Sequence, residues 1–264
     1  MKFFKSLLPL VAATTFLSQA HAATVVYGAQ HFAKDGSNTS ILNNSGDVLA
    51  AVNFGPAVAR TGPFTNANPN PATTINGIVF TAVSGAAAIT NSSLGGSITY
   101  SLNTAGIDSN RQSAVDYTAA ASLYSLVYDV ARTGGNGTPM VLSFSGLNIG
   151  TAYSVQMVFS ADNLNGNVND RSLYVTTSPP AGTGTPPASG YDLNYGPTSG
   201  PGLLTATFTA DSATQTFTLS NINEGNQRVS LAGFVLASNQ VIPEPGSCAL
   251  VALASVIGIG RRRR

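Results

Sequence analysis

The side chains that most often carry out enzymatic chemistry are sparse in this sequence and lie far apart. Beyond residue 22 the only histidine is His31, and the only glutamate before residue 243 is Glu224. The single cysteine, Cys248, lies in an apolar run near the C-terminus, so residues 23–240 hold no thiol for catalysis, metal binding or a disulfide. Neither Gly-x-Ser-x-Gly nor His-Glu-x-x-His occurs. We therefore expect a protein that is not an enzyme and has no cofactor, with His31 on its surface.

One acidic stretch has the composition of a cation site. Residues 162–170 place carboxylate and amide oxygens around a glycine, with Asp162, Asn165 and Asp170 as candidate calcium ligands. The stretch departs from the EF-hand pattern, because Leu164 occupies a ligand position and no glutamate closes the loop. A hydrated loop between two strands has the same composition, so our expectation is no bound metal, with calcium as the alternative.

A second stretch, Ser178–Gly202, is rich in proline and contains two tyrosines. It holds 25 residues and six prolines, and it predicts a long loop that is either mobile or functional. Tyr191 and Tyr195 within it offer rings that stack on sugars. The sequence contains no tryptophan, which has the largest stacking face, and this argues against a strong carbohydrate site.

The elements that must position these residues are mostly strands. Short runs of β-branched and apolar residues alternate with turn-rich segments, and several show period-two alternation, which is typical of a sheet with one buried face. The pair Asn76-Gly77 predicts a tight hairpin turn, and Ser230–Ala237, apolar on both faces, predicts a central strand. We expect an all-β fold with one domain over residues 23–240. The strands expected are Thr24–Tyr27, Val48–Phe54, Ile78–Val83, Ser97–Leu102, Val141–Phe144, Tyr153–Ser160, Leu204–Thr209, Thr216–Ser220 and Ser230–Ala237.

One segment has the period of a helix. Apolar residues recur at steps of three and four from Val115 to Val130, and two glycines follow, which predicts a helix of about four turns covering one open end of a sandwich. Tyr117, Tyr124 and Tyr128 lie within it. We expect them to pack this helix against the sheet, with a ligand platform as the alternative.

The N-terminus has the three parts of a secretory signal peptide. Two lysines precede an apolar stretch, and Ala20-His21-Ala22 matches the small-x-small pattern cut by signal peptidase. Residues 1–22 therefore form the predicted leader, and Ala23 is the predicted first residue of the mature chain.

The C-terminus, residues 241–264, combines three ordered features. Pro243, Glu244 and Pro245 precede an apolar run, Gly246–Gly260, and the chain ends with a cluster of arginines. The run holds 15 residues, fewer than the roughly 17–25 that span a bilayer comfortably, so it predicts a transient transmembrane anchor. The arginines would stay on the cytoplasmic side, which places the rest of the chain outside the cytoplasm. The cluster consists of Arg261, Arg262, Arg263 and Arg264.

This arrangement resembles the PEP-CTERM sorting signal of Gram-negative bacteria that make exopolysaccharide. The resemblance covers residues 242–264 and rests on the Pro-Glu-Pro motif, the apolar segment and the terminal arginines. It implies recognition by an integral-membrane exosortase, cleavage near the motif, and release toward the cell surface or extracellular matrix. The alternative is an ordinary C-terminal anchor with a chance Pro-Glu-Pro.

A looser resemblance concerns the segment Ser145–Tyr153 between two predicted strands. Its Gly-Leu-x-x-Gly-x-x-Tyr pattern is similar to a hairpin found in many PEP-CTERM proteins, whose bodies are jelly-roll-like β-sandwiches. Fibronectin type III domains use a similar corner. From the residues themselves we expect Leu147 and Tyr153 to clamp the turn and Gly150 to adopt a left-handed conformation.

The net charge of the body narrows the range of possible binding partners further. Between residues 23 and 242 six basic residues face ten acidic ones, a net charge of −4, which argues against a nucleic-acid partner. The partners expected are signal peptidase, exosortase, the inner membrane and exopolysaccharide. Our first interpretation is an exported cell-surface or matrix protein with a structural or adhesive body. A carbohydrate-binding module is the alternative, and a secreted hydrolase comes last.

Overall fold

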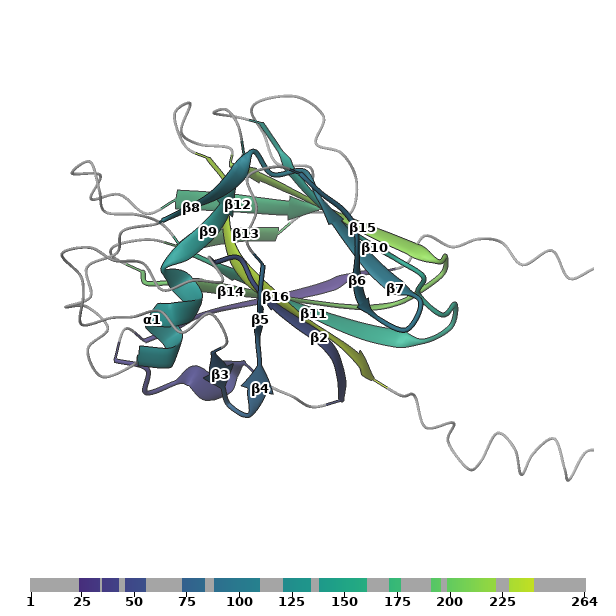
Figure 1. The fold of residues 1–264 in the computed structure, drawn as a ribbon, viewed down its shortest axis with the longest axis horizontal. Coiled ribbons are helices and arrows are strands. Elements are labelled where there is room, and N and C mark those ends of the chain that lie inside the picture. The colour runs from purple at the N-terminus through teal and green to yellow at the C-terminus, as the bar shows by residue number, and fades with distance from the viewer. Residues whose placement is uncertain are drawn as a thin grey trace, which may run out of the picture.

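The computed structural model confirms the all-β prediction (Figure 1). It describes residues 24–33, 35–42, 46–55, 73–83, 88–109, 121–133, 138–160, 171–176, 191–195, 199–221 and 228–239. The leader with Ala20, Ala22 and Ala23, the C-terminal signal, and the calcium candidates Asp162, Asn165 and Asp170 lie outside these residues. Within them, no helix is long and apolar enough to cross a membrane.

Short strands dominate the described elements, with one short α-helix and one 3-10 turn. The strands are β1 (Val26–His31), β2 (Asp47–Asn53), β3 (Thr74–Ile75), β4 (Ile78–Val79), β5 (Thr81–Ala82), β6 (Ile89–Gly95), β7 (Ile98–Leu102), β8 (Gly106–Ser109), β9 (Asp129–Arg132), β10 (Met140–Ser145), β11 (Ala152–Phe159), β12 (Arg171–Thr176), β13 (Tyr191–Tyr195), β14 (Gly202–Thr209), β15 (Thr214–Asn221) and β16 (Ser230–Asn239). The helical elements are η1 (Thr39–Ile41) and α1 (Ala121–Val127).

These strands form two sheets and a small hairpin. The first sheet has the order β1-β14-β11-β16-β2-β5, with β9 also pairing β16 and β8 pairing β9. Its pairs are antiparallel except for β2 and β5, which run parallel. The second sheet has the order β13-β12-β15-β10-β7-β6. The predicted central strand is confirmed, because β16 lies between β11 and β2 and is buried on both faces.

The main core lies between the two sheets, and we call it the inter-sheet core. Phe144 from the second sheet meets Phe234 from the first with ring centroids 5.3 Å apart, and Tyr100 meets Phe234 at 5.1 Å. Tyr153, Val155, Met157 and Phe159 of β11, predicted to face a core, are all buried in it. Alternation along the strands thus places one side chain in two between the sheets.

A second core covers the outer face of the first sheet, which the sequence pattern predicted to face water. Val158 and Gln156 of β11 are buried there, and the Gln156 side-chain amide donates a hydrogen bond to the carbonyl oxygen of Ile41 (3.1 Å). The prediction was wrong because the chain supplies a cover from distant segments, namely α1, η1 and the β3–β4 hairpin. Strand alternation reports burial on one face only and carries no information about such a cover.

Helix α1 ends before the apolar period that predicted it does. Described residues of α1 end at Val127, and from Asp129 the chain continues as β9, which pairs β8 and β16. Val130 and Ala131 consequently point into opposite cores, as strand residues do. Strand pairing overrides the helical period at this end. Helix α1 also packs on the outer face of the first sheet, and not over an open end of the sandwich as predicted. Tyr128 is buried with it, which confirms the packing role expected for that tyrosine.

The segment Ser178–Gly202 was predicted to be one long loop, but part of it forms a strand. Tyr191–Tyr195 forms β13, which pairs β12 at the edge of the second sheet. Tyr195 is fully buried, and its ring centroid lies 5.6 Å from that of Phe159. It is therefore a core residue with no face free for a sugar.

Both termini of the described fold lie at the same end of the strands of the first sheet, and we call this end the exit pole. Here β16 ends at Asn239 beside Ala152, and Ala152 also pairs Thr209 of β14. Strand β1 begins at Val26 beside Thr207, close to the end of the same strand β14. The chain thus enters and leaves the fold on one side (Figure 1).

Candidate functional site

The residues singled out for chemistry do not come together. His31 is the last residue of β1 and lies at the opposite end of that strand from the exit pole. Its side chain is exposed, and the ring Nε2 lies within hydrogen-bond distance of the Asn194 carbonyl oxygen. This confirms the expected surface position. Among the described residues, no group of three or more His, Cys, Asp or Glu side chains could hold a metal ion.

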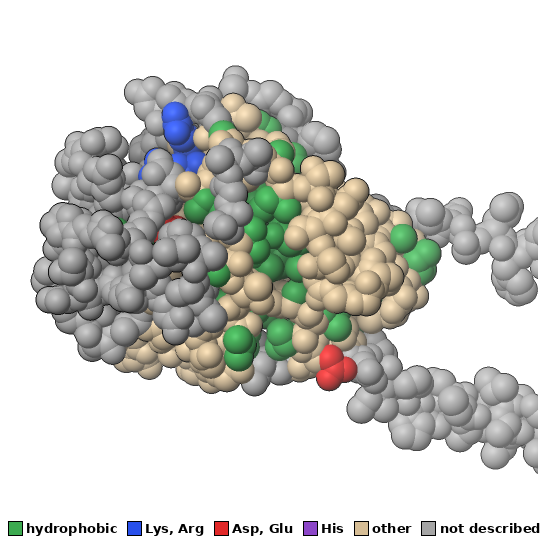
Figure 2. Space-filling view, viewed as in Figure 1, with side chains coloured by type: hydrophobic (Ala, Val, Ile, Leu, Met, Phe, Trp, Pro, Cys, Tyr) green, Lys and Arg blue, Asp and Glu red, His purple; other side chains and the backbone are tan. Residues whose placement is uncertain are grey.

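A groove instead runs along the open edge of the sandwich, between β2 of the first sheet and β6 and β7 of the second. We call it the edge groove, and its cavity has a volume of about 390 Å³. In the view of Figure 2, green hydrophobic side chains are bordered by tan surface, and coloured charged side chains lie toward the periphery. The lining residues are Val48, Leu49, Ala50, Ala51, Val52, Val79, Thr81, Val83, Ser92, Ser93, Leu94 and Tyr100.

Irregular strand pairing shapes both walls of the edge groove. In β2 the register against β16 shifts at Leu49, which is the extra residue of a β-bulge. In β6 the register against β7 shifts twice, between Ile89 and Ser92 and between Ser93 and Gly95. Bulges re-aim side chains and interrupt the regular backbone edge. Side chains as well as backbone therefore form the walls of the groove.

Tyr100 of β7 lines the groove with a buried polar group. The residue is only 1% exposed, and its hydroxyl has no hydrogen-bond partner in the part of the chain that the structure describes. The Ser92 hydroxyl lies near it without completing a bond of good geometry. Burial raises the pKa of Tyr100, and the nearby Ser92 opposes the rise. The phenol therefore stays protonated at neutral pH.

The described part of the groove rim is polar. Ser92 and Ser93 of β6 and Thr81 of β5 contribute hydroxyls, and none of the described lining residues is Asp, Glu, Lys, Arg or His. The walls between them are aliphatic, with Val48 and Val79 the most exposed. Hydroxyls beside aliphatic walls suit a neutral ligand that has both polar groups and apolar faces.

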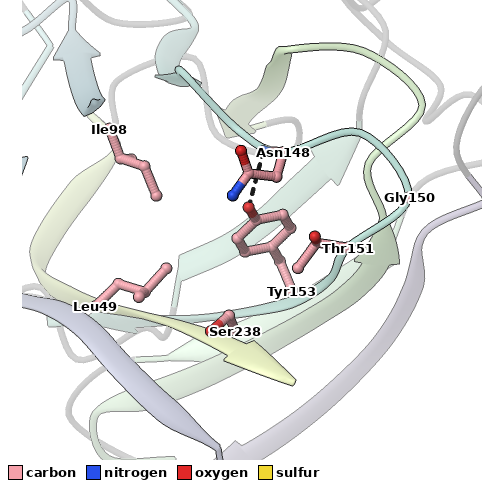
Figure 3. A pocket seen from close by; sticks show the side chains of 7 residues that line it. All are labelled: Leu49, Ile98, Asn148, Gly150, Thr151, Tyr153 and Ser238. Carbon is pink, nitrogen blue, oxygen red and sulfur yellow. Dashed lines mark hydrogen bonds between the residues drawn. The ribbon is translucent and has the colours of Figure 1, made fainter. Parts of the chain in front are cut away.

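A second cavity, which we call the corner pocket, adjoins the groove and shares Leu49 with it. Its volume is about 360 Å³, and Figure 3 shows its lining side chains. The lining residues are Leu49, Ile98, Asn148, Gly150, Thr151, Tyr153 and Ser238.

The wall of the corner pocket is the turn between β10 and β11, which the sequence pattern predicted correctly. Gly150 is left-handed at φ 84°, and Leu147 and Tyr153 are buried. The Asn148 backbone N–H donates a hydrogen bond to the Tyr153 hydroxyl (3.0 Å; Figure 3). Gly146 is also left-handed, and a Cβ there would overlap the Ser97 carbonyl oxygen. The turn is therefore held rigidly against the β6–β7 hairpin.

Sequence reasoning missed the edge groove entirely. Its walls come from residues 48–52, 79–83 and 92–100, which meet only because two sheets end side by side. The one available signal was Asn91-Ser92-Ser93, a polar run between the predicted strands Ile78–Val83 and Ser97–Leu102. In the structure this run lies in β6, where Asn91 has a φ of 48° and its N–H donates to the Ser101 hydroxyl (3.0 Å).

Comparison with known proteins gives no relative from which a site could be transferred. No family model matches the chain, and no curated protein or solved structure matches it either.

Proposed function

We propose that this protein is exported, held transiently in the inner membrane by its C-terminal segment, and processed by exosortase. Its destination is the cell surface or the exopolysaccharide matrix of a Gram-negative bacterium, where the two-sheet body serves structure or adhesion. The observation that carries the proposal is the ordered C-terminal signal: Pro243-Glu244-Pro245, then a 15-residue apolar run, then Arg261–Arg264.

The exit pole supports this proposal geometrically. Asn239 is separated from Gly246, where the apolar run begins, by seven residue steps, which span at most about 25 Å when fully extended. Val26 starts β1 at the same pole, a few residues after the predicted cleavage at Ala22. Leader and anchor can therefore both reach one membrane without either crossing the body.

We further propose that the body is jelly-roll-like. Support comes from the path of the chain from β10 to β16, in which strands alternate between the sheets except that β13 stays beside β12. Strands β10, β12, β13 and β15 lie in the second sheet, and β11, β14 and β16 lie in the first. The orders β14-β11-β16-β2 and β13-β12-β15-β10 are those expected of the two four-stranded layers of a double Greek key, with β1 and β5 flanking the first layer and β7 and β6 extending the second.

Cell fractionation of a host with and without exosortase tests the export proposal. We expect the protein outside the inner membrane in the first host and retained in the inner membrane in the second. Replacing Arg261–Arg264 by alanine should weaken retention, because the guanidinium groups hold the segment from the cytoplasmic side. Equal distribution in the two hosts would contradict processing by exosortase.

A carbohydrate-binding module is the second candidate function. The observation that favours it is the edge groove, whose described lining residues combine serine and threonine hydroxyls with aliphatic walls and include no charged side chain. A hydrolase remains the weakest candidate. Neither the structural or adhesive role nor the carbohydrate-binding role requires catalysis by the body.

A further inference from the structure

We propose that two copies of this chain associate through strand β1, edge to edge and antiparallel, with Gly28 of one copy opposite Gly28 of the other. The two first sheets would then continue into one another across the contact. The inference goes beyond the proposed function, because it gives the body a partner and does not depend on export.

The outer edge of β1 is open in the part of the chain that the structure describes. Strand β1 pairs β14 through six consecutive residue pairs without a register shift, and no other described strand pairs it. Val26 is 62% exposed, and Gly28, Gln30 and His31 are exposed as well. The backbone N–H and C=O groups along such an edge form a regular template for another strand.

The other strands that end the two sheets each have a feature that hinders pairing. Strand β6 breaks its register twice, β5 and β8 have only two and four residues, and β13 contains Asp192. Irregular register, short length and charged residues are the usual protections of sheet edges. The six residues of β1 have a regular register and include no proline, aspartate, glutamate, lysine or arginine. Strand β1 is therefore the described edge best suited to pairing.

Gly28 lies within β1, and the fold of one copy gives no reason for a glycine there. Its φ lies outside the left-handed region, and a Cβ at this position would meet nothing within 4 Å. A glycine inside a strand weakens that strand and often marks a place where another backbone approaches closely. Because no group of the same copy approaches Gly28, a second copy accounts for the glycine.

The alternation of side chains along β1 selects the register of the pair. Tyr27 and Ala29 pack toward the inter-sheet core, so Val26, Gly28 and Gln30 lie on the opposite face of the strand. A continuous sheet requires that residues opposite each other share a face. Centring the pair on Gly28 meets this requirement, because Val26 then lies opposite Gln30, and Tyr27 lies opposite Ala29. The arrangement has two-fold symmetry, the commonest symmetry of homo-oligomers, and places no like charges opposite each other.

A foreign peptide is less well suited to this edge than a second copy. A peptide that extends a sheet gains specificity from pockets that receive its alternate side chains. No residue of β1 lines the edge groove or the corner pocket. Pairing through one strand buries little area, and interfaces below about 1,200 Å² are typical of weak and transient contacts. We therefore expect a reversible dimer whose population rises with protein concentration.

Disulfide cross-linking tests the register. The sample is the full-length chain in detergent micelles with Gly28→Cys and Cys248→Ala, so that the introduced cysteine is the only one. Residues directly opposite in an antiparallel pair have Cα atoms about 4.5 or 5.5 Å apart, a separation that a disulfide can bridge. We expect mild oxidation to produce a covalent dimer. Val79→Cys in the same background is the matched control, because Val79 is 64% exposed and lies outside β1, and it should stay monomeric.

Sedimentation velocity over a range of concentrations tests the association itself. Gly28→Lys should weaken the dimer at least about five-fold, because two like charges would lie directly opposite each other at the symmetry axis. The variant should fold normally, since the space around the Gly28 Cβ position is open. Thermal unfolding checks this. Val79→Lys adds the same charge away from β1 and should associate as the unaltered protein does.

Three outcomes would overturn the inference: a monomer at every concentration, equal cross-linking of Gly28→Cys and Val79→Cys, or unchanged association of Gly28→Lys. Capture of an extended foreign peptide by a protein that stays monomeric, lost in Gly28→Lys, would overturn it in favour of that partner. The full-length chain in detergent gives these results whether or not the protein is exported. Cell fractionation therefore tests the export proposal separately.

Discussion

Two tyrosines of the same core, Tyr153 and Tyr100, have opposite hydrogen-bonding states. Each is 1% exposed, and each lines one of the two adjoining cavities. The Tyr153 hydroxyl receives a hydrogen bond from the Asn148 N–H and closes the corner turn, whereas the Tyr100 hydroxyl has no partner among the described residues. Burial alone therefore does not show whether a tyrosine hydroxyl helps to hold the fold together. The hydrogen bonds of the hydroxyl do.

The largest effect expected in this comparison comes from the corner turn itself. Gly146→Ala should lower the free energy of unfolding by at least about 3 kcal/mol, because the residue is left-handed and its Cβ would overlap the Ser97 carbonyl oxygen. Gly150→Ala is the matched control. It has a similar φ of 84° with open space around the Cβ, and should cost only about 1 kcal/mol. Urea denaturation measures both, and equal losses would mean that the turn is not rigidly packed.

The next effect separates the two tyrosines directly. Tyr153→Phe should destabilise the fold by about 1–2 kcal/mol, because it leaves the Asn148 N–H without its acceptor. Tyr100→Phe should leave stability unchanged or raise it by up to about 1 kcal/mol, because it removes a buried hydroxyl that has no partner. Losses of the same size in thermal unfolding would show that both hydroxyls are structural.

The pH dependence of stability should reveal the buried phenols through a smaller effect. Burial, with a contribution from Tyr174, raises the pKa of Tyr27 to about 12, and burial also raises the pKa of Tyr100. Above the ordinary tyrosine pKa of about 10 the unfolded chain loses protons that the folded chain keeps, so stability is full below pH 10 and falls from there toward pH 12. In unfolding titrations from pH 9 to 12 we expect Tyr100→Phe and Tyr27→Phe each to flatten this fall. The same fall of stability with pH in the unaltered protein and in both variants would contradict the raised pKa values.

Most of the sheet was readable from the sequence, because period-two alternation and turn residues are local. The hairpin at Asn76-Gly77 has φ values of 49° and 77°, as predicted. Strands β11, β14 and β15 lie where alternation placed them, and β16 lies where the continuous apolar run predicted a central strand. The end of α1 and the burial of Val158 were not readable, since they depend on pairing with β16 and on a cover of distant segments. The edge groove depends on register shifts at Leu49 and Ser93, which no local pattern encodes.

The proposed structural or adhesive role requires delivery of the body to the far side of the inner membrane, and delivery is the central claim. Its most direct test is the intact mass of the protein recovered from outside that membrane. We expect a chain that begins at Ala23 and ends near Pro243–Pro245, and in a host without exosortase a membrane-bound chain that still ends at Arg264. A cytosolic protein with the mass of the whole sequence, from Met1 to Arg264, would contradict the account.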